Sequence, residues 1–294
     1  MLLNIFCAID DFCKAFSRSW RRCLLTHGEA SRIKPSKLYL SEVMTIMVHF
    51  HLSRYRTFKD YYLKHVCPHL RMEFPGLVSY SRFVELMRGA VAPLLVFLHR
   101  CRLRPSAGIA FVDSTALKVC HNRRIHSHKT FRGVTQRGKT SLGWFYGFTL
   151  HLIVNHRGDL VSVMLTAGNV DDRNLSLMQK LTEHVVGKLF GDRGYISGTL
   201  FKTLFQRGLQ LITRLKKRMV NKLMPIMDRL LLEKRAVVES IIDQLKNLCQ
   251  IEHTRHRSPV NFLGNLFSGL IAYTFAPQKP SITADSYALL SAYA

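Results

Sequence analysis

The chain has 294 residues, and 47% of them are hydrophobic, which provides enough apolar surface for a buried core and excludes a disordered tail. Its net charge is +24, and the excess of Lys and Arg runs through both halves of the sequence. A folded protein this basic is expected to bind a polyanion, and nucleic acid is the leading candidate. A membrane surface is the weaker candidate, because no basic amphipathic helix or lipidation motif stands out.

The cysteines and the N-terminus indicate a cytoplasmic protein. There are seven cysteines and no Cys-x-x-Cys pair, which argues against both a disulfide scaffold and a zinc cluster. The first residues lack a basic segment and include Asp10 and Asp11, unlike a signal peptide. We therefore expect a cytoplasmic protein associated with the nucleoid, and we interpret the apolar run 260–276 as a buried helix.

Residues 1–105 are predicted to form a helical region. Apolar residues recur at helical spacing from Phe6 to Phe16 and from Val43 to Phe50, and Ser41 is the expected N-cap of the second segment. Further helical segments are expected at 57–64 and 81–87. Short helices with basic outer faces suit a helix-turn-helix-like DNA-binding module, and equally a plain helical cap or an oligomerisation domain.

Residues 106–280 are predicted to form an α/β domain, followed by a tail at 281–294. Strands are expected at 109–115, 144–154, 160–166, 188–192 and 209–215, with helices at 174–186, 198–206 and 235–246. The order of three strands, a helix, a strand, a helix and a strand implies a mixed sheet flanked by helices.

Two acids stand at the predicted C-terminal ends of strands, where α/β sheets usually bind their ligands. They are Asp113 and Asp192, and if their strands are neighbours the carboxylates lie side by side and repel unless a hard cation joins them. Glu239, on a helix beside the sheet, would supply a third carboxylate. Three carboxylates without a His or Cys ligand suit Mg²⁺ or Mn²⁺, and a two-metal site of this kind can cut and join phosphodiesters.

Each acid also has a plain structural interpretation. Asp113 can cap a turn, and Asp192 can be an N-cap or Asx-turn residue. Glu239 shares one helical stripe with Arg235, Asp243 and Lys246, which alone is typical of a surface helix with ion pairs. The placement of the three acids together, in a strongly basic chain, favours the functional interpretation.

These segments resemble the DDE transposases of bacterial insertion sequences. Residues 111–115 are similar to the segment of their first catalytic acid, and residues 191–195 to that of the second. Arg235, Glu239 and Lys246 match the spacing of their Tyr-Arg-Glu-Lys signature, although Leu232 stands where the signature has Tyr. The segment 254–262 extends the resemblance to insertion-sequence family nine-eight-two, and the likeness covers about residues 35–280.

The resemblance implies a ribonuclease-H-like catalytic core that holds two divalent ions and cuts and joins the terminal inverted repeats of an element. It also implies that Arg235 and Lys246 touch the DNA end near the scissile phosphate. That role agrees with electrostatics, because cations that flank a metal-bound carboxylate would otherwise compete with the metal. Since two ends must be brought together, we expect a homodimer in the DNA complex. Leu232 affects only the supporting contact of the signature Tyr.

Further contacts with the DNA backbone are expected from residues 118–139, which contain seven Lys or Arg, three His and no acid. The candidates there and just after the catalytic helix are Arg123, Arg124, Lys129, Arg132, Arg255 and Arg257. The alternative is a solvated loop, and a metal on the histidines is disfavoured because they lack Cys or acidic partners.

Two pairs of residues are predicted to be structural. Trp144 and Phe145 are expected in the core, with stacking on an unpaired base as the alternative. Asp171 and Asp172 are expected to cap the helix that begins near Asn174, with a role beside the catalytic acids left open.

The sequence therefore predicts a DNA transposase that depends on Mg²⁺ or Mn²⁺. A metal-dependent nuclease on the same core, which cuts without joining, is a related alternative. A catalytically silent DNA-binding protein that only holds element ends is the alternative from another class.

Overall fold

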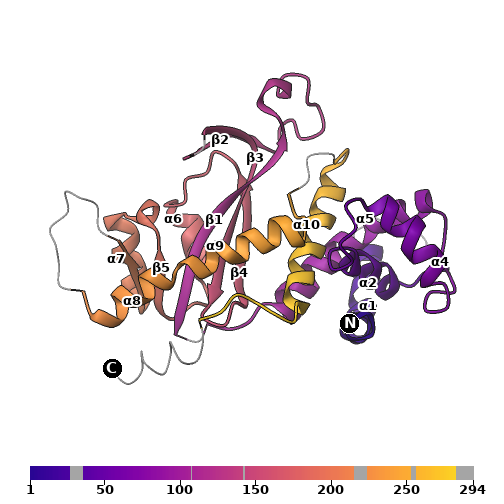
Figure 1. Ribbon diagram of the computed structural model, residues 1–294, viewed down its shortest axis with the longest axis horizontal. Helices are drawn as coiled ribbons and strands as arrows, with labels where there is room; N and C mark the ends of the chain where they lie inside the picture. The colour runs from indigo at the N-terminus through magenta and orange to yellow at the C-terminus, as the bar shows by residue number, and fades with distance from the viewer. Residues whose placement is uncertain (27–35, 107, 142, 215–223, 253–255, 283–294) are drawn as a thin grey trace. The chain divides into compact units, whose positions relative to one another are not determined.

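The computed structural model describes residues 1–26, 36–106, 108–141, 143–214, 224–252 and 256–282, and the chain divides into two compact units (Figure 1). The first unit comprises Met1–Arg102, Asn247–Ile251 and His256–Ala276, and the second comprises Leu103–Lys246, Glu252–Arg255 and Pro277–Ala294. The segment 256–276 thus belongs to the first unit, whereas the sequence prediction placed it with 106–280. The spacing of residues along a sequence does not show that the chain returns to an earlier unit.

The first unit is helical, as predicted for residues 1–105. Helix α2 packs against α1, α5 and α10, and α10 also packs against α5. The helices are α1 (Leu2–Thr26), α2 (Leu40–Phe50), α3 (Phe58–Tyr61), η1 (Tyr62–Val66), α4 (Cys67–His69), α5 (Tyr80–Phe97), η2 (Leu98–Arg102) and α10 (Pro259–Phe275).

The start of α2 corrects one prediction. Its N-cap is Tyr39, and Ser41 lies inside the first turn. The backbone N–H of Tyr39 donates to the Glu42 carboxylate over 2.6 Å, so the third helical residue reaches back to the start of the helix. The prediction of Ser41 as the cap is therefore wrong, because the helix already begins at Leu40 and the Glu42 carboxylate binds the N–H of the residue before it.

Buried polar contacts hold the centre of the first unit together. His51, just after α2, is buried, and its Nδ1 lies at hydrogen-bond distance from the carbonyl of Cys249. Its Nε2 lies 2.9 Å from the hydroxyl of Ser268 on α10. Burial lowers the pKa of His51 to about 4, so the ring is neutral at pH 7. The prediction of a buried helix at 260–276 is confirmed by α10, and no helix in the described part of the chain has the length and apolar character needed to cross a membrane.

The second unit is built on a six-stranded mixed sheet, which confirms the predicted α/β class. The strand order is β2-β3-β1-β5-β6, and β4 also pairs with β3. The strands are β1 (Ile109–Cys120), β2 (Gln136–Thr140), β3 (Gly143–Asn155), β4 (Leu160–Ala167), β5 (Gly187–Gly191) and β6 (Leu209–Thr213). The helices are η3 (Asn122–Arg124), α6 (Leu175–Leu181), η4 (Arg193–Tyr195), α7 (Gly198–Gln206), α8 (Ile226–Lys234), α9 (Ala236–Asp243) and η5 (Gln244–Leu248), which runs into the first unit.

Strand extents differ from the prediction where basic residues join the sheet. β1 continues to Cys120 because it pairs with β3 from Ala110 to Cys120. β2, inside the predicted basic loop, pairs antiparallel with the first half of β3. Charged residues can occupy these strands because their side chains point to solvent while the backbone completes the ladder. α6 ends at Leu181, five residues before the predicted end at 186, because turns lead into β5.

Helices cover both faces of the sheet. Ala110 and Val112 of β1 join a buried cluster with residues of α6 and α7, such as Met178 and Leu204. Side chains alternate along a strand, so Phe111 and Asp113 point to the opposite face. Phe111 packs on Phe190 there, and α9 packs along β1 (Figure 1).

Candidate active site

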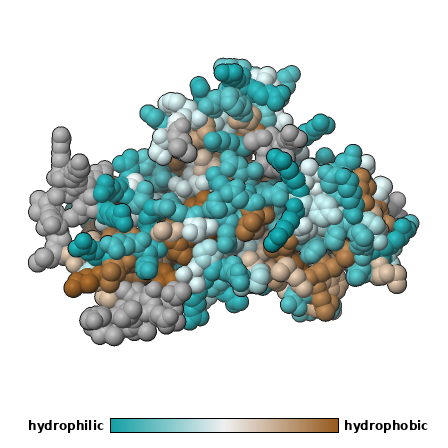
Figure 2. Space-filling model, in the orientation of Figure 1, coloured by the Kyte–Doolittle hydropathy of each residue, from teal (hydrophilic) through white to brown (hydrophobic). Residues whose placement is uncertain are grey.

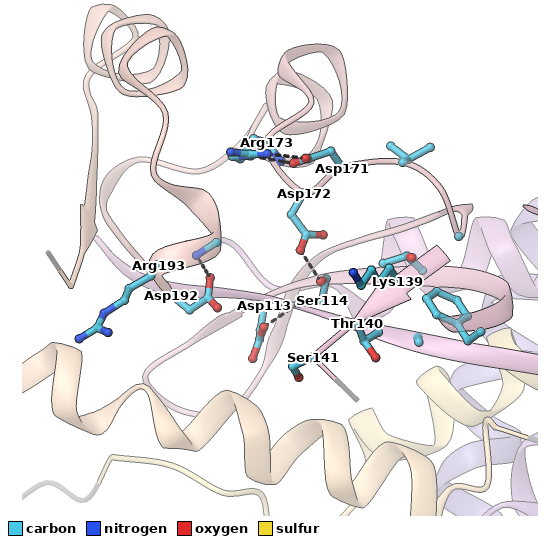
Figure 3. A pocket seen from close by; sticks show the side chains of 16 residues that line it. Asp113, Ser114, Lys139, Thr140, Ser141, Asp171, Asp172, Arg173, Asp192 and Arg193 are labelled. Atoms are coloured by element: carbon cyan, nitrogen blue, oxygen red, sulfur yellow. Dashed lines mark hydrogen bonds and ion pairs between the residues drawn. The ribbon is translucent and has the colours of Figure 1, made fainter. Parts of the chain in front are cut away.

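The register of β1 and β5 brings two acids together. The strands pair in parallel, with Ile109 beside Lys188 and Phe111 beside Phe190. Continuing the register by two residues sets Asp113 opposite Asp192. Asp192 follows the end of β5, as predicted, whereas Asp113 lies within β1, so its predicted place at a strand end is wrong. It nevertheless follows the part of β1 that pairs with β5, and Figure 3 shows the two carboxylates beside one another.

The Asp113 carboxylate is mostly buried, and its environment raises its pKa. Burial is the main cause and brings the pKa to about 6, and the nearby Asp192 adds to it. The Arg235 guanidinium opposes the shift, and so does the backbone N–H of Ser114, which donates to Asp113 Oδ1 over 2.9 Å. A buried carboxylate beside a second one favours a bound cation, because a cation relieves both the burial and the repulsion.

Asp192 is held by the turn that follows it. Its Oδ1 accepts the backbone N–H of Gly194 over 2.7 Å, so it is the N-cap of η4. A side chain at Gly194 would begin 2.8 Å from the same oxygen, which explains the glycine. Asp192 therefore has the capping role that was the structural alternative, and it also lies opposite Asp113.

Arg235 connects the sheet to the third predicted acid. It stands between α8 and α9, and its guanidinium donates to Asp113 Oδ2 over 3.1 Å and forms an ion pair with Glu239. The apolar side of the helix packs as predicted at Val238, Ile241 and Leu245, while Leu248 is exposed. Glu239 is 58% exposed and is joined to Asp113 through Arg235.

Lys246 is paired within the protein. Its ammonium lies 2.9 Å from Glu252 and donates to the carbonyl of Ala116 over 2.8 Å. Glu252 also accepts the backbone N–H of Lys118, so it ties this end of the helix to β1. No feature of the sequence singled out Glu252.

The donor set can be tested against a divalent ion. Asp113 and Asp192 offer adjacent carboxylate oxygens, the ligands that Mg²⁺ and Mn²⁺ prefer, so this pair fits. Glu239 does not converge with them, because its carboxylate is turned to Arg235. Within the described residues, no three His, Cys, Asp or Glu side chains form a ready metal cluster. A three-carboxylate site would require Glu239 to exchange Arg235 for the ion.

Asp192 lines two cavities. One, of about 570 Å³, is lined by Asp113, Asp172, Asp192, Lys139 and Arg193 among others (Figure 3). The other, of about 430 Å³, is lined by Asp192, Arg214, Leu232, Arg235 and Glu239. Both are open and bordered by cations, so either can admit a phosphate group to the paired acids.

The basic segment presents its cations to solvent. Arg123, Arg124, Lys129 and Arg132 are exposed on the loop between β1 and β2, which projects beyond the sheet and is hydrophilic (Figures 1 and 2). Among the described residues, none of these four side chains has a carboxylate within ion-pair distance. Arg257 is exposed on the first unit, and Arg255 lies outside the described residues.

The aromatic pair after this loop divides between core and surface. Phe145 is buried, as predicted, but Trp144 is 57% exposed, so its assignment to the core is wrong. Alternation along β3 places the two side chains on opposite faces, and Trp144, near the start of the strand, is the exposed one. Lys139, which lines the larger cavity, lies 5.7 Å from the centre of the Trp144 ring.

Asp171 and Asp172 do not cap α6, which corrects another prediction. Asn174 is the cap, and its side chain accepts the N–H of Leu177 over 3.0 Å. Asp171 forms two hydrogen bonds with the guanidinium of Arg173. Asp172 reaches the strand, where it accepts the Ser114 hydroxyl over 2.9 Å.

The sequence belongs to a known family. Residues 104–259, more than half of the chain, match the family described as "Transposase DDE domain". This range contains the paired acids, Glu239 and Lys246. The chain therefore belongs to the DDE transposase domain family, which confirms that part of the resemblance noted from the sequence.

Similarity outside the family match is remote. No curated protein is similar enough to the chain to count as a match. A solved structure of a piggyBac transposase synaptic complex with hairpin DNA is 12% identical, with 99% of this chain and 82% of that chain covered and a TM-score of 0.39. A likeness at this level carries no argument about the site, which depends on the geometry above.

Proposed function

We propose that this protein is a DNA transposase that cleaves the ends of an insertion sequence and joins them to target DNA. The observation that carries the proposal is the register of β1 and β5, which sets Asp113 opposite Asp192 within a DDE-family domain. The mixed sheet flanked by helices supports a ribonuclease-H-like core. The signature at Arg235, Glu239 and Lys246 supports membership of insertion-sequence family nine-eight-two.

Asp113, Asp192 and Glu239 would hold one or two divalent ions. Such ions, when bound, would neutralise the scissile phosphate and assist the attacking oxygen and the leaving oxygen. The protein's own part is to orient the acids. Gly194 fixes Asp192, and the backbone of Ser114 fixes Asp113. Arg235 pairs with Glu239, and its guanidinium would be available to a DNA phosphate if Glu239 exchanged this pair for an ion.

DNA would be bound by cations around the two cavities and on the basic loop. Arg123, Arg124, Lys129 and Arg132 are exposed and suited to the phosphate backbone. Lys246 can donate to a phosphate once its ion pair with Glu252 opens. We assign Arg255 and Arg257 the same role. The helical first unit would serve as the helix-turn-helix-like binding module, and the protein would act on paired ends as a homodimer.

The test uses labelled DNA that carries the terminal inverted repeats of the element, incubated with purified protein in Mg²⁺ or in EDTA. We expect Mg²⁺-dependent cutting at the repeat boundary, followed by joining of the freed 3′ end to target DNA. Glu239→Gln keeps the size of the side chain and removes its charge, so it should abolish cutting and leave DNA binding nearly unchanged. Glu183→Gln, on an exposed turn after α6 and outside the lining of both cavities, is the matched control.

The products separate the alternatives. Cutting without joining would replace the transposase by a metal-dependent nuclease on the same core. Specific binding without cutting would support a silent DNA-binding protein that only holds element ends. Cutting by Glu239→Gln at the wild-type rate would remove Glu239 from the site.

A further inference from the structure

A chain of hydrogen-bonding groups lies on the far side of β1 from Arg235. Asp172 accepts the hydroxyl of Ser114 through Oδ2 over 2.9 Å, and its Oδ1 lies 3.3 Å from Nδ1 of His151. His151 is fully buried, and its Nε2 lies 2.9 Å from the hydroxyl of Thr166. Ser114 and His151 are direct partners in the antiparallel pairing of β1 with β3. The Asp172 carboxylate is therefore hydrogen-bonded to β1 at Ser114, the residue that follows Asp113.

The arrangement is not that of a nucleophilic serine. The Ser114 hydroxyl donates to Asp172 and not to the imidazole, so His151 is not placed to remove its proton. Nor is Asp172 a surface acid with a chance contact, because it lines the larger cavity and two strands contribute its partners (Figure 3). Tyr195, buried beside these groups, keeps its proton, since burial and the Asp172 and Asp113 carboxylates raise its pKa.

Ser114 connects these hydrogen-bonded groups to Asp113. Its backbone N–H donates to Asp113 Oδ1, while its side chain points to the other face and is fixed by Asp172. Rotation of the Ser114 peptide would break the bond to Asp113, and the Asp172 bond resists that rotation. Groups that hold metal-binding carboxylates through hydrogen bonds set the affinity of the site.

We propose that Asp172 is a positioning residue for Asp113: it fixes Ser114 and so sets the affinity of the paired acids for a divalent cation. His151 lies beside Asp172, with its Nδ1 3.3 Å from the carboxylate, and is not needed for this role. The inference rests on the proposed function, because it requires a cation at Asp113 and Asp192. It adds a fourth acid that acts through hydrogen bonds and does not bind the ion itself.

The experiment measures Mn²⁺ affinity of the full-length protein without DNA, by electron paramagnetic resonance, together with DNA-end cleavage and the melting temperature. We expect Asp172→Ala and Ser114→Ala each to weaken Mn²⁺ binding by about 10- to 100-fold. The double variant should be no weaker than either single variant, because both changes interrupt one path. Asp172→Asn can still accept the Ser114 hydroxyl and should retain most of the affinity. Asp171→Ala, in the adjacent acid that binds Arg173, is the matched control and should bind like wild type.

Several results would overturn the inference. One is wild-type Mn²⁺ affinity in Asp172→Ala. Another is a double variant whose loss is the product of the two single losses, with Asp172→Asn as weak as Asp172→Ala, because the carboxylate would then contact the ion directly. A fall in melting temperature without a change in Mn²⁺ affinity would reduce Asp172 to a structural role. If Mn²⁺ affinity follows the expected series but wild type cuts no DNA end, the transposase proposal fails and the positioning role stands.

Discussion

Removal of Arg235 should shift the pH dependence of DNA-end cleavage. The guanidinium lies 3.1 Å from the Asp113 carboxylate, and both side chains are 19% exposed. It is the strongest influence that lowers the pKa of Asp113, which burial still raises to about 6. Arg235→Ala therefore leaves Asp113 buried and removes the charge that does most to lower its pKa.

The size of the shift follows from the geometry. At this separation and an effective dielectric constant of about 20, the attraction is roughly 5 kcal/mol, which sets an upper bound of about four pKa units. A neighbouring Arg commonly lowers a carboxyl pKa by about one to three units. The pKa of Asp113 in the variant should thus rise well above its value in the wild type. The ionised carboxylate is the form that binds a cation, so activity should be retained only at higher pH.

The assay is the initial rate of end cleavage between pH 5.5 and 9.5, with Mg²⁺ well below saturation because a bound ion competes with protons. The acid limb of the profile should move up by about one to three pH units in Arg235→Ala. Loss of a phosphate contact would instead lower the rate equally at all pH values. Arg173→Ala, which removes a cation that lines the larger cavity and pairs with Asp171, should leave the limb in place. An unchanged acid limb in Arg235→Ala would refute the argument.

Three further predictions concern stability and geometry. Asp113→Asn should stabilise the protein by about 1–3 kcal/mol at pH 7 in urea unfolding. Because the pKa of Asp113 is raised, its contribution to stability is fully present below pH 3.8, the ordinary value, and is lost as pH rises through about 6. Equal stability of the variant and the wild type at pH 7 would contradict this. Gly194→Ala should slow cleavage by about 100-fold, because the added Cβ displaces Asp192, and should not weaken DNA binding in gel shifts. Gly198→Ala, where a Cβ meets nothing within 4 Å, should have no effect. The pKa of His51 is lowered from 6.5 to about 4, so the free energy of unfolding should fall by up to about 3 kcal/mol as pH drops from 6.5 towards 4. His51→Gln should flatten this part of the stability curve, and an unchanged curve would contradict the prediction.

The sequence predicted that Asp113 and Asp192 would lie side by side if their strands were neighbours, and the parallel pairing of β1 with β5 meets that condition. The apolar runs before both acids carry that information. The extension of β1 to Cys120 could not be predicted, because its later residues are held by β3 and not by their own pattern. Long-range pairing overrides local propensity in such strands.

The contacts between side chains in the site were harder to predict from the sequence than the strands that carry them. Arg235 and Glu239 follow from helical spacing, yet their connection to Asp113 depends on how α9 packs on β1. Asp172 was expected to cap a helix because acids are common at that place, and nothing local indicated that it reaches Ser114. Glu252 likewise gains its role only from the approach of Lys246 across the fold.

The most direct test of the central claim is to locate Mn²⁺ by anomalous diffraction in crystals of the wild-type protein and of Asp192→Asn. We expect an anomalous peak in contact with the carboxylates of both Asp113 and Asp192, and its loss in the variant. A peak elsewhere, on one of the two acids alone, or unchanged in the variant would contradict the claim that the register of β1 and β5 builds one cation site.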